Sequence, residues 1–152
     1  MDAIFDRVVR EFFPNTTIPF WKKWLFRTAF GNKVFSRLIY NERLVNKSGV
    51  EWVNAVVELL GLKCESEHHQ FNNIPEHGAT VVISNHPTVI DGLSLIYTVS
   101  RVRSDIKIIA NHVLPIIFPQ VSELTIGIEN MAGKMSHKKF REMNDHLRKG
   151  GV

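Results

Sequence analysis

Cysteine is almost absent from this sequence, since Cys64 is the only one in 152 residues. A single cysteine excludes a disulfide framework within the chain and is typical of proteins from a reducing cytoplasm. A cysteine nucleophile needs a neighbouring base, and no base can be assigned to Cys64. We therefore interpret Cys64 as a structural residue.

Long hydrophobic runs are also missing. No stretch reaches the roughly 18 continuous apolar residues that span a bilayer. Charged residues at positions 6, 7, 10 and 11 interrupt the first apolar stripe, so no signal peptide is predicted. We expect the chain to lie on a membrane rather than to cross it.

Metal-ligand spacings are lacking as well. His68, His69 and His77 are close in sequence, but adjacent strand residues point to opposite faces. No cysteine or acidic residue stands at a recognised zinc-ligand spacing from them. We predict no metal site and no bound cofactor, and we expect no nucleic-acid partner.

Aromatic and basic residues are abundant at the N-terminus. Residues 1–40 hold ten of the fifteen aromatics and seven Lys/Arg against three Asp/Glu, so the entire net charge of +4 lies there. Apolar periodicity predicts helices in this region. Aromatic rings interleaved with cations suit the headgroup region of a membrane. An aromatic-rich helical bundle packed on the rest of the chain is the alternative, and it stays open.

Periodicity predicts further helices and strands. A helix over residues 48–60 has Ser48 as its N-cap and Glu51 as a capping-box partner, with Gly61 as its stop. A last helix and two buried strands are predicted over residues 136–149, 106–110 and 124–128.

The stretch that carries chemistry is residues 81–92, VVISNHPTVIDG. The β-branched run Val81–Ile83 predicts a buried strand, and an apolar helical pattern begins at Leu93. Pro87 suits the first position of that helix. His86 is thereby placed in the turn at the carboxyl end of a strand, where open α/β sheets bind ligands.

His86 and Asp91 can form a general-base pair. In an unbroken helix a separation of five residues puts two side chains on different faces, so His86 must lie in the turn before the helix. The carboxylate would then fix the imidazole tautomer while the other ring nitrogen takes a proton from a substrate. Gly92 has no side chain to obstruct a ligand. Alternatively, His86 is a helix cap and Asp91 an acid favoured by the helix dipole.

The whole string resembles the His-x4-Asp motif of the glycerolipid acyltransferases, the family of glycerol-3-phosphate and lysophospholipid acyltransferases. The resemblance includes Ser-Asn-His-Pro-Thr after a strand and Asp-Gly at the far end, and it extends to residues 105–112 and 124–128. It implies that His86, oriented by Asp91, activates an acceptor hydroxyl for attack on acyl-CoA or acyl carrier protein. Asn85 and Gly92 would lie against the substrate.

A second motif of this family often ends in an arginine that contacts the acceptor's phosphate. Glu129 and Asn130 stand at the matching positions here, so we predict them as substrate contacts. Their identity leaves room for an alcohol or amino-lipid acceptor that depends less on phosphate. By contrast, Asn111-His112 repeats the Asn-His pair but has no acid five residues later, so His112 is a poor candidate for the base.

The resemblance implies an α/β fold, with N-terminal helices followed by a mixed β-sheet flanked by helices. Motifs of the Phe-Pro-Glu-Gly and proline-rich types, which come later in the family, are not present. We therefore predict an N-terminal helical, membrane-associating region over residues 1–61. Residues 62–152 are predicted to be the first half of an acyltransferase domain, so this chain is expected to be a fragment.

The predicted function is acyl transfer from acyl-CoA or acyl carrier protein to a lysophospholipid, glycerol phosphate or related lipid. The expected location is the cytoplasmic face of a membrane, with the membrane surface and the lipid acceptor as partners. Two alternatives stay open. One is a non-catalytic peripheral membrane protein that retains part of the acyltransferase framework. The other is a thioester or lipid hydrolase that uses the same His/Asp pair on water.

Overall fold

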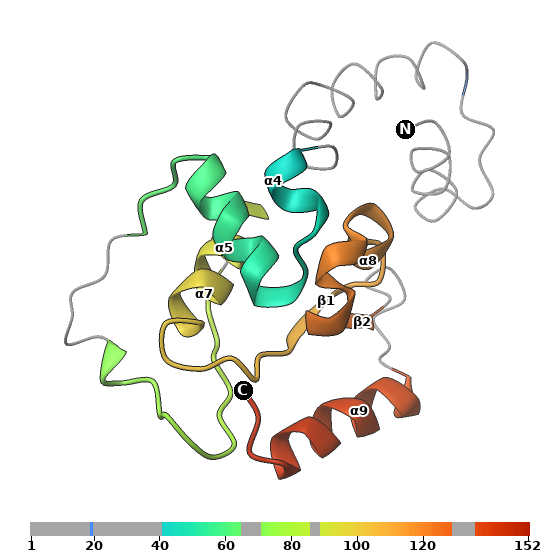
Figure 1. The fold of residues 1–152 in the computed structure, drawn as a ribbon. Helices are drawn as coiled ribbons and strands as arrows, with labels where there is room; N and C mark the ends of the chain where they lie inside the picture. The colour runs from blue at the N-terminus through green and yellow to red at the C-terminus, as the bar shows by residue number, and fades with distance from the viewer. Residues whose placement is uncertain (1–18, 20–40, 65–70, 86–88, 129–135) are drawn as a thin grey trace.

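The computed structural model describes residues 19, 41–64, 71–85, 89–128 and 136–152. Its elements carry the labels of Figure 1. In chain order they are α4 (Glu42–Val45), α5 (Gly49–Leu59), α7 (Val89–Val99), β1 (Ile108–Asn111), α8 (Leu114–Ile117), the 3-10 helix η1 (Pro119–Leu124), β2 (Thr125–Ile128) and α9 (His137–Arg148).

The sheet consists of β1 and β2, which pair in parallel with Ile108 opposite Thr125 and Asn111 opposite Ile128. Parallel strands need a crossover between them, and α8 and η1 provide it. Helices around a small parallel sheet make the chain broadly α/β, as predicted. The described strands include no antiparallel pair, so the mixed sheet of the prediction is not found in that part of the chain.

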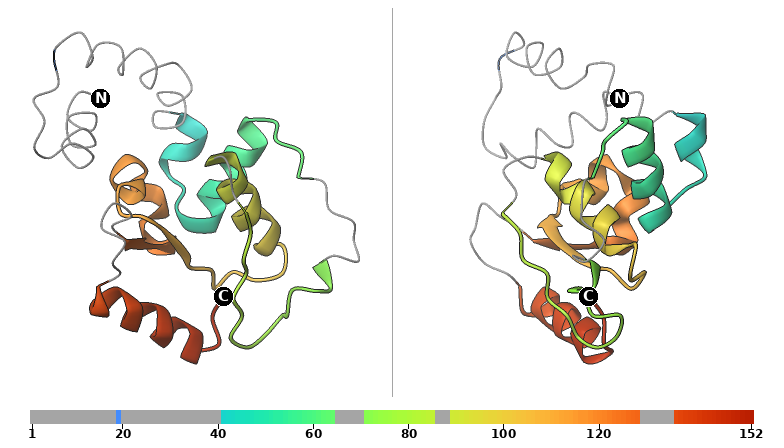
Figure 2. Two further views of the ribbon diagram at one scale, coloured as in Figure 1. Left: turned by 180° about the vertical axis from the view of Figure 1, so that it is seen from behind. Right: turned by 90° about the vertical axis from the view of Figure 1, so that its left-hand side faces the viewer.

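Helices cover the two strands from two sides. α5 packs on α7 and η1, and α9 contacts β2 from across the strands (Figures 1 and 2). Trp52 of α5 packs against Phe118 with ring centroids 5.4 Å apart. The buried core contains Leu44, Trp52, Val53, Val56, Val57, Ile96, Val99, Ile106, Phe118, Val121, Leu124 and Val152. Residues from both sides of position 61 share this core, and the domain boundary predicted there stays a prediction.

Local sequence signals account for α5 but not for its N-terminus. The helix predicted over residues 48–60 is confirmed, and Gly61 follows it with φ +63°. The predicted capping box is not formed. Ser48 makes no side-chain cap bond, and its hydroxyl instead donates to Glu123 Oε1 at 3.3 Å. Glu51 pairs with Lys47. The Glu123 carboxylate thus lies at the N-terminus of α5, where a negative charge stabilises the helix dipole.

The other predicted elements are also found. α9 confirms the last helix, with Ser136 Oγ accepting from the Lys139 N–H at 3.3 Å and Gly150 following at φ +85°. β1 and β2 confirm the two strands, with β1 shifted by one or two residues from the predicted range.

The predicted buried strand at Val81–Ile83 is wrong. These residues form no strand, and Val81 and Ile83 are 68% and 89% exposed. A β-branched run becomes a buried strand only where a neighbouring strand pairs with it. Thr80, just before the run, donates its N–H to the Gly151 carbonyl at 3.1 Å, and no ladder continues past it to another described residue.

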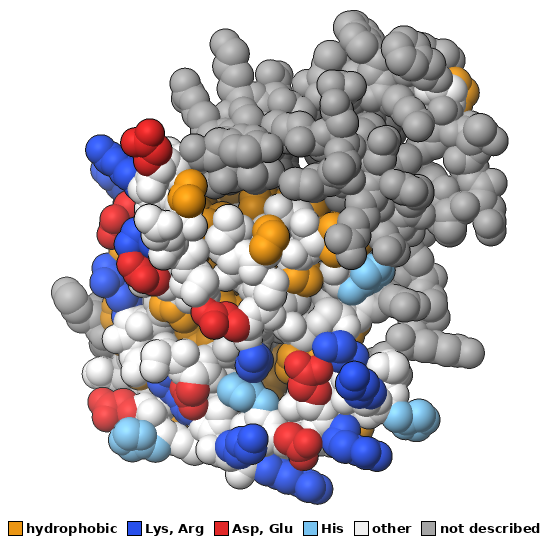
Figure 3. Space-filling model, turned by 45° about the vertical axis from the view of Figure 1, so that its right-hand side comes forward, with side chains coloured by type: hydrophobic (Ala, Val, Ile, Leu, Met, Phe, Trp, Pro, Cys, Tyr) orange, Lys and Arg blue, Asp and Glu red, His pale blue; other side chains and the backbone are white. Residues whose placement is uncertain are grey.

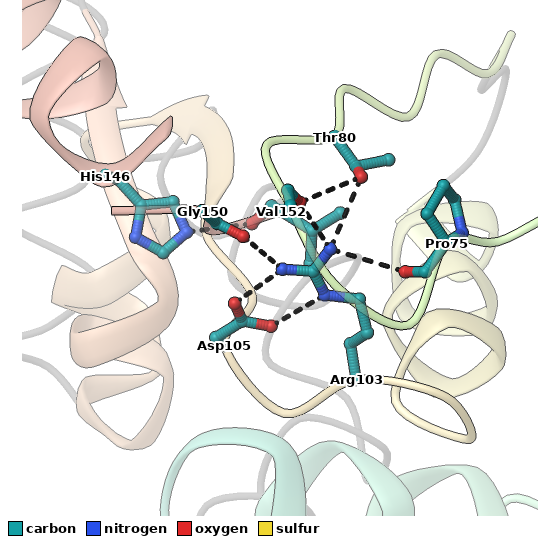
Figure 4. Close-up of polar contacts among 8 residues, drawn as sticks. Pro75, Thr80, Arg103, Asp105, His146, Gly150 and Val152 are labelled. Carbon is teal, nitrogen blue, oxygen red and sulfur yellow. Dashed lines mark hydrogen bonds and ion pairs between the residues drawn. The ribbon is translucent and has the colours of Figure 1, made fainter. Parts of the chain in front are cut away.

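Arg103 is the buried cation of the described structure, with its side chain 3% exposed. Its guanidinium binds the Asp105 carboxylate in a fork, Nε to Oδ1 at 2.9 Å and Nη2 to Oδ2 at 2.6 Å (Figure 4). A buried charge is stable only when it is paired and hydrogen-bonded. The guanidinium in turn lowers the pKa of Asp105 below its ordinary value, against the opposing effect of burial.

The same guanidinium also binds two other segments of the chain. Nη1 donates to the Gly78 carbonyl at 2.6 Å and to the Pro75 carbonyl and Thr80 Oγ1 at 3.3 Å. Nη2 donates to the Gly150 carbonyl (Figure 4). Arg103 therefore holds together the turn before Val81, the entrance to β1 and the end of the chain.

The Arg103–Asp105 pair predicts a specific pH dependence of stability. Because the pKa of Asp105 is lowered in the folded state, its contribution is complete above the unfolded-state value of about 3.9 and is lost as the pH falls through the folded-state pKa. Asp105→Asn should therefore lower the melting temperature by a few degrees at neutral pH. This deficit should shrink as the pH falls below that unfolded-state value.

Thermal unfolding followed by circular dichroism at neutral and acid pH tests this dependence. The matched control is Asp145→Asn, because Asp145 is exposed on α9 and forms no ion pair with Arg103. A deficit of Asp105→Asn that persists unchanged into acid would contradict the prediction.

Candidate functional site

The candidate site lies at the carboxyl ends of β1 and β2. The parallel register brings these ends together, with Asn111 beside Ile128. Ligands of open α/β sheets bind at the carboxyl ends of the strands. A short segment, residues 100–107, connects α7 to β1, and the N-terminal turn of α7 is at the other end of the helix from this segment (Figure 1).

Asp91 is the predicted site residue that the structure positions best. It lies in the first turn of α7 and is half-buried. An acid at this position is favoured by the helix dipole, and it can accept a hydrogen bond from a histidine that precedes the helix. His86 lies outside the described residues, so its pairing with Asp91 stays a prediction.

Gly92 follows Asp91 in α7 and faces open space. Among the described residues, a Cβ added at Gly92 would meet no atom outside its own helix within 4 Å. On the same turn, Ile90 is 48% exposed. Among the described residues, nothing fills the space beside Gly92, and its predicted contact with substrate stays a prediction.

The other predicted contacts are only partly described. Asn85 is exposed, and its carbonyl accepts a hydrogen bond from Ser84 Oγ at 2.9 Å. Its predicted contact with substrate stays a prediction. Glu129 and Asn130 follow β2 directly and lie outside the described residues, so their contact with substrate stays a prediction.

Asn111 and His112, which the motif did not indicate as site residues, shape the end of the sheet. Asn111 Oδ1 accepts the Val113 N–H at 2.9 Å, which turns the chain as β1 ends. The His112 N–H then donates to the Ile128 carbonyl at 3.1 Å. The backbone of His112 crosses so close to Gly127 that a Cβ there would lie 3.0 Å from His112 Cα. A glycine within a strand is the sequence signal for such an approach.

A hollow in the described structure lies elsewhere, on α9. It has a volume of about 350 Å³, and side chains of α9 alone line it: His137, Phe140, Arg141, Asn144, Asp145 and Arg148. Figure 3 shows charges of both signs gathered over the lower part of the molecule, and hydrophobic side chains in a band above them. Because this hollow lacks every residue of the predicted site, we do not assign the chemistry to it.

Within the described ranges, no three His, Cys, Asp or Glu side chains gather as a metal site would require. No helix in those ranges has the length and apolar character to cross a membrane.

Comparison of the chain with models of protein families, with curated proteins and with solved structures gives no match. Function is therefore inferred from the motif of residues 81–92 and from the edge of the sheet described above.

The close approach at Gly127 predicts that its substitution destabilises the fold. In Gly127→Ala the new methyl group would press on the backbone of His112, which cannot move without breaking its hydrogen bond to Ile128. We expect a loss of about 1–3 kcal/mol in the free energy of unfolding, measured with urea.

Gly92→Ala is the matched control. Gly92 is a helical glycine, and its new methyl group would contact no described atom outside its own helix. It should be neutral or stabilising by up to about 1 kcal/mol. Equal losses in the two variants would show that the contact with His112 is unimportant.

Proposed function

We propose that this protein is an acyltransferase that moves a fatty acyl group from acyl-CoA or acyl carrier protein to a lipid hydroxyl. The observation that carries the proposal is the position of Asp91 in the first turn of α7. An acid in that turn can meet a histidine five residues earlier, which is impossible for two residues well inside one helix. The motif around Asp91 supplies that histidine as His86.

In the proposed reaction His86, oriented by Asp91, accepts the proton of the acceptor hydroxyl. The hydroxyl oxygen attacks the thioester carbonyl, the carbon–sulfur bond breaks, and the thiol leaves with the proton from His86. A positioned base of this kind accelerates such a reaction roughly 10²- to 10⁴-fold. Backbone N–H groups in the first turn of α7 have no partner within the helix and would stabilise charge on the thioester oxygen.

The proposed acceptor is a lysophospholipid, glycerol phosphate or related lipid. Glu129 and Asn130 stand where the acyltransferase pattern often has a phosphate-binding arginine. An acidic and a neutral residue would favour an alcohol or amino-lipid over a strongly anionic acceptor, because a carboxylate repels phosphate. The open space beside Gly92 supports the approach of such a molecule to Asp91.

The proposed location is the cytoplasmic face of a membrane. Residues 1–40 carry the whole net charge of +4 together with two thirds of the aromatics, which supports binding to an anionic lipid surface. The charged surface around α9, by contrast, mixes both signs (Figure 3). We therefore assign membrane contact to residues 1–40 and not to α9.

A second candidate is a peripheral membrane protein without catalysis. It is favoured by the aromatic and basic residues 1–40, which suit a lipid surface whether or not a thioester is cleaved there. Both candidates place the chain on a lipid surface, and they differ in whether a thioester is cleaved there.

Release of CoA from a long-chain acyl-CoA tests the proposal. The chain is mixed with anionic vesicles and, in turn, with lysophospholipid, glycerol phosphate and amino-lipid acceptors. We expect release that depends on an acceptor, at least about 10²-fold slower in His86→Ala and reduced in Asp91→Asn. His77→Ala is the matched control, because His77 is exposed in the turn before residue 81.

Three other outcomes of this experiment would point away from the acyltransferase. Release that needs no acceptor would identify a hydrolase. Vesicle binding without release by the unsubstituted chain would favour the non-catalytic protein. Full activity in His86→Ala would remove the general base from the mechanism.

Gly92→Ala separates activity from stability. A methyl group beside Asp91 would fill space that the substrate needs, while the helix gains from replacing glycine by alanine. We expect an undiminished melting temperature and a CoA release rate lowered several-fold at limiting acceptor. Unchanged release would show that the substrate does not approach this turn.

A further inference from the structure

The helix α9 lies at the edge of the described fold (Figures 1 and 2). It contacts β2, and Met143, His146 and Leu147 share one face of the helix and are half-buried. The side chains that line the hollow of about 350 Å³ lie on the opposite side, which we call the outer face of α9: His137, Phe140, Arg141, Asn144, Asp145 and Arg148. The outer face therefore has no role in holding α9 to the sheet.

Two arginines of the outer face are without an acidic partner among the described residues. Arg141 and Arg148 form no ion pair there, whereas Lys139 of the same helix binds Glu142 at 2.8 Å. Asp145 follows Arg141 by four residues and precedes Arg148 by three, which are spacings at which helical ion pairs form. Because Asp145 pairs with neither, both guanidiniums keep their donors for an acceptor on another molecule.

The spacing of these arginines sets the spacing of the acceptors. Seven residues are two helical turns, so Arg141 and Arg148 lie on one stripe about 10 Å apart. A guanidinium presents a planar fork that matches a carboxylate. Carboxylates seven residues apart on a second helix have the same separation and also share one face.

Phe140 adds an apolar contact beside the arginines. Its ring is 52% exposed although it belongs to a helix of strongly polar sequence. Aromatic and arginine side chains are the types enriched in protein interfaces and in their hot spots. An apolar side chain of the second helix, one turn from each carboxylate, would cover this ring.

Asp145 argues against a uniformly anionic partner. Its carboxylate is exposed on the outer face between the two arginines, and charges of both signs lie over this part of the molecule (Figure 3). A lipid surface or a nucleic-acid duplex presents phosphates everywhere and would meet Asp145 as a like charge. A protein helix can place a neutral or basic side chain opposite Asp145, so it fits the pattern of the outer face.

We propose that the outer face of α9 binds an acidic helix of a partner protein. Carboxylates seven residues apart bind Arg141 and Arg148, and an apolar side chain between them packs on Phe140. This is the helix-in-groove mode of recognition, with charge complementarity setting the choice of partner. The inference does not depend on acyl transfer, because it uses no residue of the stretch 81–92.

The test measures binding of labelled synthetic helices to the full chain by fluorescence anisotropy. The peptides are alanine-rich and about 18 residues long, a length at which such sequences are helical in water. One peptide carries two glutamates seven residues apart with a leucine between them on the same face, and a second has glutamine at both positions. We expect the glutamate peptide to bind about tenfold more tightly at low salt and to lose this advantage at high salt.

Substitutions on the outer face should remove this binding. Arg141→Gln together with Arg148→Gln should weaken binding of the glutamate peptide about tenfold, because both carboxylates lose their partners. Phe140→Ala should weaken binding of both peptides several-fold, because the leucine loses its apolar contact.

The matched control is Lys138→Gln together with Lys149→Gln. It removes the same two charges from exposed positions at the ends of α9 that do not line the hollow. Its affinity for the glutamate peptide should stay within about twofold of the unsubstituted chain. All four substituted cations are exposed, so circular dichroism should show unchanged melting temperatures.

Three results would overturn the proposal. A glutamate peptide that binds no better than the glutamine peptide would show that the arginines do not select a carboxylate. Equal losses in the arginine and lysine double variants would show that only the overall charge of α9 matters. Absence of peptide binding, together with binding to anionic vesicles or duplex DNA that the arginine variant loses, would identify a phosphate surface as the occupant.

Discussion

The buried guanidinium of Arg103 sets the constraint on which the described structure depends. A cation removed from water must be surrounded by acceptors, and Arg103 obtains them from Asp105 and from the carbonyls of Pro75, Gly78 and Gly150. These groups come from three parts of the chain that are far apart in sequence. Their convergence fixes the start of β1 beside the turn at residue 78 and beside the end of the chain.

The position of Arg103 also determines where the carboxyl edge of the sheet lies. β1 starts next to Arg103 and β2 pairs with it in parallel, so both strands end together at Asn111 and Ile128. α7 presents Asp91 in its first turn. The structural cation and the carboxyl edge of the sheet lie at opposite ends of the same strands. Substitutions at one end can therefore be separated from those at the other.

The described fold also leaves apolar surface exposed. Ile109 lies on β1, an edge strand of the described sheet, and is 51% exposed, while Val81 and Ile83 are 68% and 89% exposed. Such an edge is a template for another strand, and natural proteins normally cover or charge it. The core under α5 shows the contrast, because Trp52 and Phe118 pack on each other there and are only 2% and 8% exposed.

Much of the local structure could be predicted from the sequence. Apolar periodicity and glycine stops predicted α5 and α9, and β-branched runs predicted β1 and β2, because these signals act within one element. The motif likewise indicated an acid in a helix's first turn, which Asp91 occupies. The roles of His86, Glu129 and Asn130 stay predictions from the motif.

Long-range pairing decided the rest. Sequence spacing assigned the N-terminus of α5 to Ser48 and Glu51, whereas the fold brings Glu123 to it from η1. No local pattern indicated that Arg103 would be buried, because its acceptors are carbonyls that any residue could supply. Residues 81–83 have the composition of a buried strand and yet lie exposed. Composition determines what a segment can bury, and only the tertiary structure determines whether a neighbour is there to pair with it.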